Sequence, residues 1–346
     1  MDNSIIEKYQ KLWSAQSTYL NTASFGLPPT PAFEELQKAL NDWRFGRTSW
    51  ENWAQSAEQS RKAFARLINV KLDSVAIGAN VSSFIGLLAA SLPKGSKVVV
   101  PEIEFTSNLF PWLSNSDIKV TTVPLKYLAE EVQKGYDVCS FSMVQSATGE
   151  IVDLPSLKQA AQTHNCLLIA DLTQSAGWLP MNGDQVDVAI CSAYKWLMSP
   201  RGSAFAYVNP TYTNSIIPYS AGWYAGEDPF ESLYGPPLRL ANSARKLDIS
   251  PAWFSWVGTA PVIELLEEIT IEQIHSYNVG LANYFLEGLD LAPSNSAIVS
   301  IDIEDADIKF KNSNIQASTR AGGLRASFHL YNTIEDVNRA LDALRK

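Results

Sequence analysis

Seven short apolar runs between residues 70 and 210 constrain the fold more than any other feature of the sequence. They are "SVAIGA" (74–79), "KVVVPE" (97–102), "KVTTVP" (119–124), "DVCSFSMV" (137–144), "CLLIAD" (166–171), "VDVAICSA" (186–193) and "GSAFAYV" (202–208). Several are apolar on both faces, which is typical of strands that helices cover on both sides. Helix-like segments such as 155–165 separate them. The alternation predicts an α/β fold with an open, mostly parallel central sheet.

The last third of the chain is organised differently. Residues 209–250 are rich in Tyr, Pro, Gly and Ser, and they predict a long irregular connection of a kind that usually carries function. Beyond it we expect helices near 251–268 and 271–288, a strand at 297–303, an apolar run at 323–331 and a last helix from about 334. We therefore predict a large domain over 15–250 and a small α+β domain over 251–346. Segment 1–14 is expected to pack on the small domain.

Charge and composition exclude several classes of protein. The net charge of −9 argues against a general binder of nucleic acid or of anionic membranes. Residues 74–93 carry no charge, but their serines and glycines favour a strand, a turn and a buried helix over a membrane span. The N-terminus shows no basic region followed by an apolar stretch, so we expect no signal peptide and a cytoplasmic protein.

The three cysteines point to core positions rather than to chemistry. Cys139, Cys166 and Cys191 all lie in apolar, strand-like runs, and no CxxC pair is present. Neither a zinc site nor a disulfide framework is indicated. We predict buried free thiols in a reducing compartment.

A lysine stands where the predicted sheet should bind a ligand. Open α/β sheets bind ligands at the carboxyl ends of their strands. Lys195 follows the run 186–193 and is flanked by Tyr194 and Trp196. Such a lysine can be a phosphate ligand, an ion-pair partner or a Schiff-base nucleophile, because partial burial lowers the pKa of its amine. The alternative is a solvated loop lysine.

Two further polar groups follow neighbouring strands. Asp171 ends the run 166–171, and Gln174 comes three residues later. A carboxylate there needs a partner, although a helix cap or a structural ion pair would also supply one. Asn80 and Ser82 begin a predicted helix after the first strand, where backbone N–H groups and a hydroxyl suit a phosphate. An ordinary helix N-cap is the alternative.

Taken together, these groups match the needs of one cofactor, pyridoxal 5′-phosphate (PLP). Its aldehyde requires a lysine, its pyridine nitrogen requires a carboxylate, and its phosphate requires a helix N-terminus. No GxGxxG or Walker A motif is present, so dinucleotide and nucleoside triphosphate sites lose support. The histidines, which are His164, His275 and His329, form no HExxH or HxH pattern, and we predict no catalytic metal.

The chain resembles the class V aminotransferase family of fold type I PLP-dependent enzymes, in its cysteine desulfurase and isopenicillin-N-epimerase-like branch. The resemblance runs from "YLNTASFGLPP" near residue 19 to "LYNTIEDVNRAL" near residue 341. Its most specific part is "DLTQSAGWLPMNGDQVDVAICSAYKWLMSPRGSAFAYV", and "RASFHLYNTIEDVNRAL" is a second, independent match. The family implies a large PLP-binding domain, a small C-terminal domain and a homodimer with a shared active site.

The resemblance also assigns roles to matching positions. Lys195 would form the internal aldimine, Asp171 would pair with the pyridine nitrogen, and Gln174 would hydrogen-bond the phenolic oxygen of the ring. Arg325 would grip the α-carboxylate of the substrate, with Asn21 nearby. The remaining expected cofactor contacts are Asn80, Val81, Ser82, Phe105, Ser146, Ser192, Tyr194 and, on the phosphate of the partner subunit, Ser250.

Departures from the family pattern narrow the expected chemistry. Phe105 stands where desulfurases keep a ring-stacking histidine, and a phenyl ring stacks but moves no proton. Tyr194 replaces a common histidine, and Ser146 replaces a common asparagine. Because no cysteine follows Cys191, the resemblance predicts that the chain is not a persulfide-forming cysteine desulfurase.

The sequence therefore predicts a PLP-dependent enzyme that acts on a small α-amino acid. An external aldimine would form, and Lys195 would abstract the α-proton. An aminotransferase ranks first, a β-eliminating C–S lyase second and an epimerase third, while a catalytically silent PLP-binding protein is the rival class. Arg44 and Arg47 are candidates for contacting a second substrate charge, near tryptophans that suit the substrate entrance, the dimer contact or, equally, ordinary packing. The role of Arg245 stays open.

Overall fold

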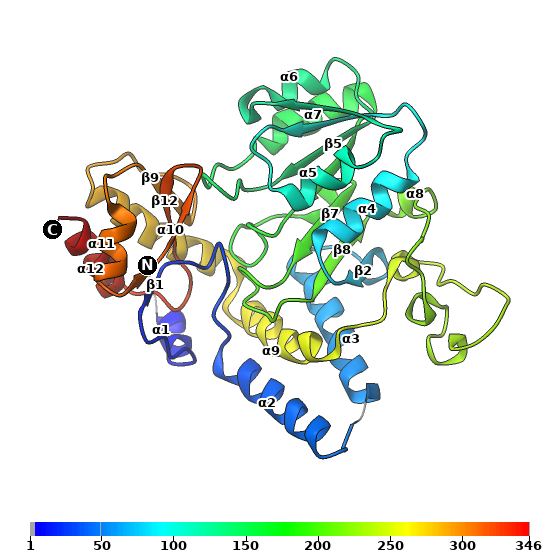
Figure 1. Ribbon diagram of the computed structural model, residues 1–346, viewed down its shortest axis with the longest axis horizontal. Coiled ribbons are helices and arrows are strands. Elements are labelled where there is room, and N and C mark those ends of the chain that lie inside the picture. Colours follow the sequence, from blue (N-terminus) through cyan, green and yellow to red (C-terminus); the bar gives the residue numbers. More distant parts are fainter. Residues whose placement is uncertain (1–3, 49, 346) are drawn as a thin grey trace.

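A twisted seven-stranded sheet forms the centre of the protein, as the computed structural model shows for residues 4–48 and 50–345 (Figure 1). The strand order is β2-β8-β7-β6-β5-β3-β4. The strands are β2 (Val75–Gly78), β3 (Lys97–Pro101), β4 (Lys119–Val123), β5 (Val138–Ser142), β6 (Leu167–Asp171), β7 (Val188–Ser192) and β8 (Ala204–Val208). Strand β8 runs antiparallel to both of its neighbours, β2 and β7, and the other strand pairs are parallel. The predicted α/β class and mostly parallel sheet are confirmed.

Helices cover both faces of this sheet, as its doubly apolar strands require. On one face, α4 (Val81–Ser91) and α5 (Thr106–Leu113) pack on alternate strand residues such as Val98 and Ile190. On the other face lie α3 (Trp50–Leu67), α6 (Leu128–Val132) and α7 (Leu154–His164), over residues such as Val99 and Ala189. The uncharged stretch 74–93 thus becomes β2 and α4. Among the described residues, no helix is long and apolar enough to cross a membrane.

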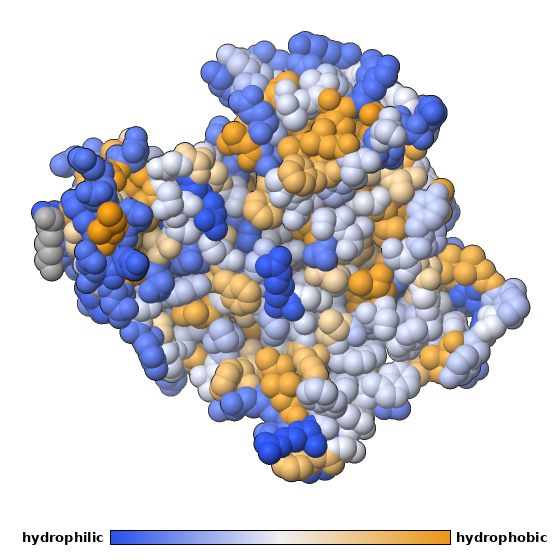
Figure 2. Space-filling model, in the orientation of Figure 1, coloured by the Kyte–Doolittle hydropathy of each residue, from blue (hydrophilic) through white to orange (hydrophobic). Residues whose placement is uncertain are grey.

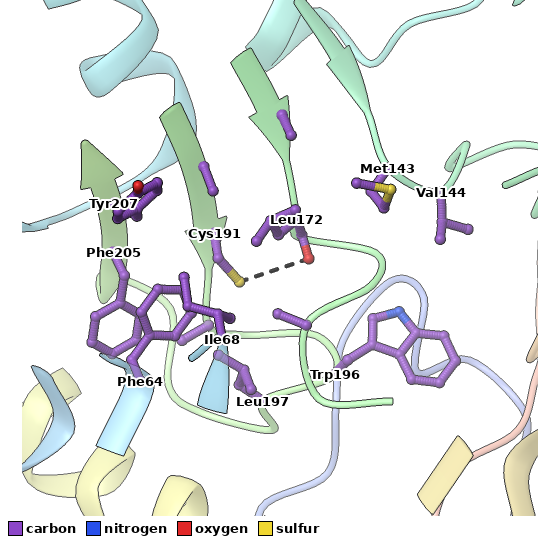
Figure 3. Close-up of a cluster of buried hydrophobic side chains, with 14 of the residues drawn as sticks. Phe64, Ile68, Met143, Val144, Leu172, Cys191, Trp196, Leu197, Phe205 and Tyr207 are labelled. Atoms are coloured by element: carbon purple, nitrogen blue, oxygen red, sulfur yellow. Dashed lines mark hydrogen bonds between the residues drawn. The ribbon is translucent and has the colours of Figure 1, made fainter. Parts of the chain in front are cut away.

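The core below the sheet edge fixes the loop that carries Lys195. Figure 3 shows Phe64 of α3 beside Phe205 of β8, and the two rings stack with centroids 4.2 Å apart. Cys191 lies in the same cluster, with its Sγ 3.8 Å from the Leu172 carbonyl oxygen. Trp196 is fully buried there as well. All three cysteines are buried free thiols, as the sequence predicts.

The C-terminal part of the chain forms a second, smaller layer. A three-stranded antiparallel sheet has the order β11-β12-β9, and β1 pairs with β10 in a separate two-stranded sheet. The strands are β1 (Thr18–Tyr19), β9 (Ile298–Ile301), β10 (Ile315–Gln316), β11 (Ser318–Arg320) and β12 (Gly323–Ser327). The helices around them are α1 (Ser4–Gln10), α10 (Ile271–Glu287), α11 (Ala306–Asn312) and α12 (Ile334–Arg345).

Three further α-helices complete the described part of the chain. They are α2 (Thr30–Arg44), α8 (Pro210–Thr213) and α9 (Trp253–Ile269). The helix α9 packs against α2 and α3 beside the large sheet and then leads into α10 (Figure 1). The N-terminal Gln10 donates hydrogen bonds to the Tyr277 hydroxyl and to the Leu330 and Asn332 carbonyls. The division of the chain at residue 250 stays a prediction.

A buried ion pair fastens the irregular connection 209–252 to the large sheet. Arg61 of α3 is 1% exposed, and its guanidinium contacts both carboxylate oxygens of Asp248, at 2.6 and 3.1 Å. The same guanidinium donates to the Val75 carbonyl, and Asp248 accepts from the Ile77 amide. One ion pair thereby holds together α3, β2 and the segment that leads to Ser250.

Removing one partner of this ion pair should cost a large share of the stability. We expect Asp248→Ala to lower the free energy of unfolding by about 3 kcal/mol, because the buried Arg61 keeps only the partly exposed Glu58 as a counter-ion and the Ile77 amide loses its acceptor. Urea denaturation followed by circular dichroism measures the loss. Asp342→Ala is the matched control, since Asp342 pairs with Arg345 on the exposed surface and should cost about 1 kcal/mol or less. Equal, small losses for both variants would contradict this account.

Candidate active site

A pocket lies at the edge of the large sheet where its parallel strands end. Most of the residues predicted to bind a cofactor line it together, although they come from five different strand ends. The lining residues are Ala79, Asn80, Val81, Phe105, Ser107, Ser142, Ser146, Asp171, Thr173, Gln174, Ser192, Tyr194, Lys195 and Arg201. Ser82, Ser250, Arg325 and Asn21 do not line it in this single chain.

Lys195 is buried in the pocket wall between β7 and β8. Only 5% of the residue is exposed, and its Nζ lies 5.1 Å from the centroid of the Phe105 ring. Burial lowers the pKa of this amine to about 8, against the opposing charge of Asp171. The positive charges of Arg325 and Arg320 lower it further. A substantial fraction of the amine is therefore neutral, and nucleophilic, near physiological pH.

The backbone around Lys195 is held from three sides. The Trp196 indole donates to Oε1 of Gln174 at 2.9 Å, and the Trp196 carbonyl lies 3.0 Å from Nε2 of His329. The Gly26 amide donates to the Tyr194 carbonyl. A Cβ at Gly26 would lie 2.0 Å from the Lys195 carbonyl oxygen, so only glycine permits this approach. The N-terminal segment thus helps to place the reactive amine.

Asp171 ends β6 and is also buried, with 5% of the residue exposed. Its Oδ1 accepts a hydrogen bond from the Thr173 amide at 2.8 Å. Burial raises the pKa of this carboxyl, while the Thr173 contact and the charge of Lys195 oppose the rise. Among the described residues, no cation lies within 4 Å of it. The site therefore contains a buried carboxylate suited to a cationic partner.

A second buried carboxylate, that of Glu104, orders another part of the pocket wall. It was not predicted from the sequence. Glu104 accepts hydrogen bonds from the Phe105 amide and from both the amide and the hydroxyl of Ser142. Burial raises the pKa of Glu104, partly offset by those hydrogen bonds, and the nearby Asp171 charge adds to the rise. Glu104 thus fixes Phe105 and Ser142, both of which line the pocket.

The sequence leaves two roles open for Asn80, phosphate binding and helix capping. The geometry shows that Asn80 caps α4. Its Oδ1 accepts from the Ser83 amide at 2.9 Å and from the hydroxyls of Ser82 and Ser83. The first turn of α4 is thereby ordered at the pocket rim. The phosphate contacts of Asn80, Val81 and Ser82 stay predictions.

Tyr194 and Arg201 form the other side of this rim. The Arg201 guanidinium lies 4.8 Å from the centroid of the Tyr194 ring. Burial raises the pKa of the Tyr194 phenol, against the opposing charge of Arg201, so the phenol is neutral. Arg201 was not expected from the sequence, although its position six residues after Lys195 in the same loop is a usable signal.

Gln174 and Ser146 connect the pocket to the small sheet. Nε2 of Gln174 donates to the Ala23 carbonyl and to the Ser146 hydroxyl, both at 2.9 Å. Both N–H groups of the amide are thus used within the protein. The predicted hydrogen bond from Gln174 to a cofactor ring would replace the one to Ser146, and this role stays a prediction.

Arg325 reaches the same serine from β12. It is 1% exposed; its Nη1 donates to the carbonyl and hydroxyl of Ser146, and its Nη2 donates to the Ser24 hydroxyl at 2.7 Å. Its Nε is buried without a partner. Burial lowers the pKa of Arg325 to about 10, and the charge of Arg320 adds to this effect. A buried guanidinium without a carboxylate partner suits an anionic ligand.

The other residues singled out in the sequence do not line the pocket. Asn21 pairs with Ser327 through its backbone, and its side-chain oxygen is buried without a partner. Ser250 is exposed beyond the Asp248 ion pair. Arg47 forms an ion pair with Asp42 just beyond the end of α2. Trp50 packs on Trp223, Phe230 and Trp253 beside the irregular connection.

The comparisons with known proteins place this geometry in a family. Residues 41–316 match the family model of aminotransferase class V. An uncharacterized aminotransferase, YcbU, from Bacillus subtilis is 26% identical, with 98% of this chain and 97% of the relative covered. A probable cysteine desulfurase from Pyrococcus abyssi is 25% identical, with 95% and 93% covered.

A solved structure shares the fold along nearly the whole chain. It is the complex between the cystine C–S lyase C-DES and its reaction product cysteine persulfide. It superposes with a TM-score of 0.86 at 20% identity, covering 97% of this chain and 98% of the other.

One expectation from the sequence is wrong. The lack of a cysteine after Cys191 predicted that the chain is not a persulfide-forming cysteine desulfurase. Two relatives that match more than nine-tenths of this chain are nevertheless named probable cysteine desulfurases, and cysteine desulfurases are among the structures that share the fold. One missing residue type in a loop therefore does not separate this chain from those relatives, and the exclusion is withdrawn.

The lowered pKa of Lys195 predicts an unusual reactivity profile. Cyanate carbamylates neutral amines, so in protein stripped of bound small molecules its rate at Lys195 should rise with pH and level off near pH 9. Exposed lysines, with pKa values near ~10.4, should keep rising beyond that point. Asp171→Asn should shift the Lys195 profile to lower pH, because the carboxylate favours the ammonium form. Peptide mass spectrometry reads each site, and a Lys195 profile like that of the exposed lysines would contradict the account.

Proposed function

Because the chain belongs to the class V aminotransferase family, whose cofactor is pyridoxal 5′-phosphate, we propose that it is an enzyme that transfers the amino group of a small α-amino acid. The observation that carries this proposal is the buried Lys195, the one evident base of the pocket, next to the buried carboxylate of Asp171. Each residue role below is part of the proposal.

The residues of the pocket fit the cofactor. When bound, the cofactor supplies an electron sink that stabilises negative charge at the α-carbon of the amino acid. Asp171, which has no cationic partner within 4 Å among the residues that the structure describes, would hold the pyridine nitrogen in its protonated form. The first turn of α4 and the Ser192 hydroxyl would hold the phosphate. Arg201 would balance the phosphate charge, since the other predicted phosphate contacts are neutral.

A single base supports amino transfer over two-base chemistry. Nζ of Lys195 would take the proton from the α-carbon and return it to a second carbon on the same face. Phe105, on the wall near this amine, moves no proton, and the Tyr194 phenol holds its own proton because burial raises its pKa. Racemisation with two opposed bases is therefore less well supported. Arg325 would bind the α-carboxylate and orient the α-proton toward Lys195.

A β-eliminating C–S lyase is the second candidate. It needs the same base, Lys195, but the electron pair left at the α-carbon would expel a sulfur substituent from the β-carbon instead of being reprotonated at a second carbon. Its support is the name of a protein that shares the fold, a cystine C–S lyase, together with kynureninases and cysteine desulfurases among the relatives. Sulfur-containing amino acids therefore belong in any substrate panel.

We further propose that the protein is a homodimer. Large apolar side chains are exposed on α2, on α5 and in the irregular connection, and Figure 2 shows apolar surface over α5. Examples are Trp43, Phe110 and Leu238. A second copy covering these surfaces could bring the exposed Ser250 of each subunit to the pocket of the other. Sedimentation equilibrium that returned a monomer would contradict this proposal.

Product analysis tests the reaction type. The protein with added PLP is incubated with each proteinogenic amino acid and cystine, with and without pyruvate or 2-oxoglutarate as amino acceptor. Amino transfer predicts one new keto acid for each amino group gained by the acceptor, without free ammonia. Pyruvate with stoichiometric ammonia, formed without an acceptor, would instead establish β-elimination. A change of configuration at the α-carbon alone would establish epimerisation and contradict the one-base argument.

A further inference from the structure

The hairpin that carries Arg325 brings a second arginine to the same face. Strands β11 and β12 pair antiparallel, with Ser318 opposite Arg325 and Arg320 opposite Gly323. Side chains alternate between the two faces of a strand, so Arg320 and Arg325 share a face as diagonal neighbours. Gly323, the direct partner of Arg320, places no side chain between them.

The turn between the strands holds Arg320 in place. Only Ala321 and Gly322 connect Arg320 to Gly323, and both have positive φ angles, 46° and 88°. Such two-residue turns match the twist of the paired strands and fix the register. Alanine seldom adopts a positive φ angle. A residue keeps such a strained conformation only where the surrounding structure enforces it. The backbone of Arg320 is therefore well defined, although its side chain is exposed.

Both guanidinium groups approach one oxygen atom. Nη2 of Arg325 donates to the Ser24 hydroxyl at 2.7 Å, and Nη2 of Arg320 lies 3.5 Å from the same hydroxyl. Neither arginine forms an ion pair with a carboxylate among the described residues. The charge of Arg320 is also felt at Lys195 and at Arg325, where it lowers both pKa values. Two cations therefore face the site without a counter-ion.

Like charges placed this close are unfavourable unless an anion joins them. Arg325, which is buried and nearer to the pocket, is matched to the α-carboxylate of the amino acid. Arg320, which is exposed on the same face, is left for a second anionic group on the side chain. Arg47, considered for this task from the sequence, is instead paired with Asp42.

We propose that the substrate is a dicarboxylic amino acid, whose side-chain carboxylate binds Arg320 while its α-carboxylate binds Arg325. This inference rests on the proposed function, because it assigns the substrate class of the same site. A guanidinium binds a carboxylate through two parallel hydrogen bonds, so the paired arginines select dianions over monoanions. The spacing of diagonal neighbours suits a short spacer, as in aspartate or glutamate.

The test compares each dicarboxylic amino acid with its amide. L-aspartate, L-asparagine, L-glutamate and L-glutamine are titrated into the PLP-loaded protein, and the change in the cofactor absorption gives each dissociation constant. Succinate and succinamate, which carry no amino group, are titrated separately by calorimetry. The wild type should bind each dianion about tenfold more tightly than its matched amide.

Variants assign this preference to one residue. Arg320→Met should weaken the binding of the dianions about tenfold and leave the amides unchanged, and Arg320→Lys should restore part of the loss. Arg345→Met removes an exposed arginine at the end of α12, which contacts Asp342 and the Gly288 carbonyl rather than Ser24, and should change neither.

The possible failures are distinguishable. If the wild type binds amides and dianions equally, or if Arg320→Met weakens all ligands alike, the dicarboxylate assignment is overturned while the proposed function stands. If no amino acid changes the cofactor absorption of the wild type, the proposed function fails and the inference falls with it. In that case a preserved preference for succinate would still mark an anion site at Arg320.

Discussion

The burial of Lys195 beside Asp171 is the constraint on which the rest of the structure depends. Moving a lysine and a carboxylate out of water is costly, and within the described part of the chain no direct ion pair offsets the cost. The protein supports the arrangement with a rigid frame. Trp196 in the core, Gly26 against the Lys195 carbonyl and Thr173 on the Asp171 carboxylate all hold these two groups at the sheet edge. Burial in turn lowers the pKa of Lys195 and makes its amine reactive.

The site also combines distant parts of the sequence around this pair. Asp171 ends β6 and Lys195 follows the adjacent β7, whereas Arg325 comes from the small sheet and contacts the pocket residue Ser146. The N-terminal segment contributes Ser24, which contacts Arg325 and Arg320. The buried ion pair of Arg61 and Asp248 anchors the segment that leads to Ser250. Cations thus gather around one pocket while the chain as a whole is acidic.

Much of the fold could be predicted because its strands are apolar on both faces, and such runs are visible without any knowledge of their partners. Asp171 could be selected because it ends such a run, and Lys195 because it comes two residues after one. The helices α2 and α3 were not anticipated, since many of their residues face solvent. Glu104 and Arg320 were missed because their meaning depends on which strands lie side by side. The hairpin register that joins Arg320 to Arg325 requires a turn at Ala321, a residue that rarely marks one.

The most direct test of the central claim is the absorption spectrum of the purified protein, wild type beside Lys195→Ala, after addition of pyridoxal 5′-phosphate. The account predicts a visible band in the wild type that borohydride reduction fixes covalently at Lys195, as peptide mass spectrometry would show. The variant should lack that band and carry no cofactor adduct, while its circular dichroism stays that of the wild type. A wild type without the band, or covalent attachment at another lysine, would contradict the account.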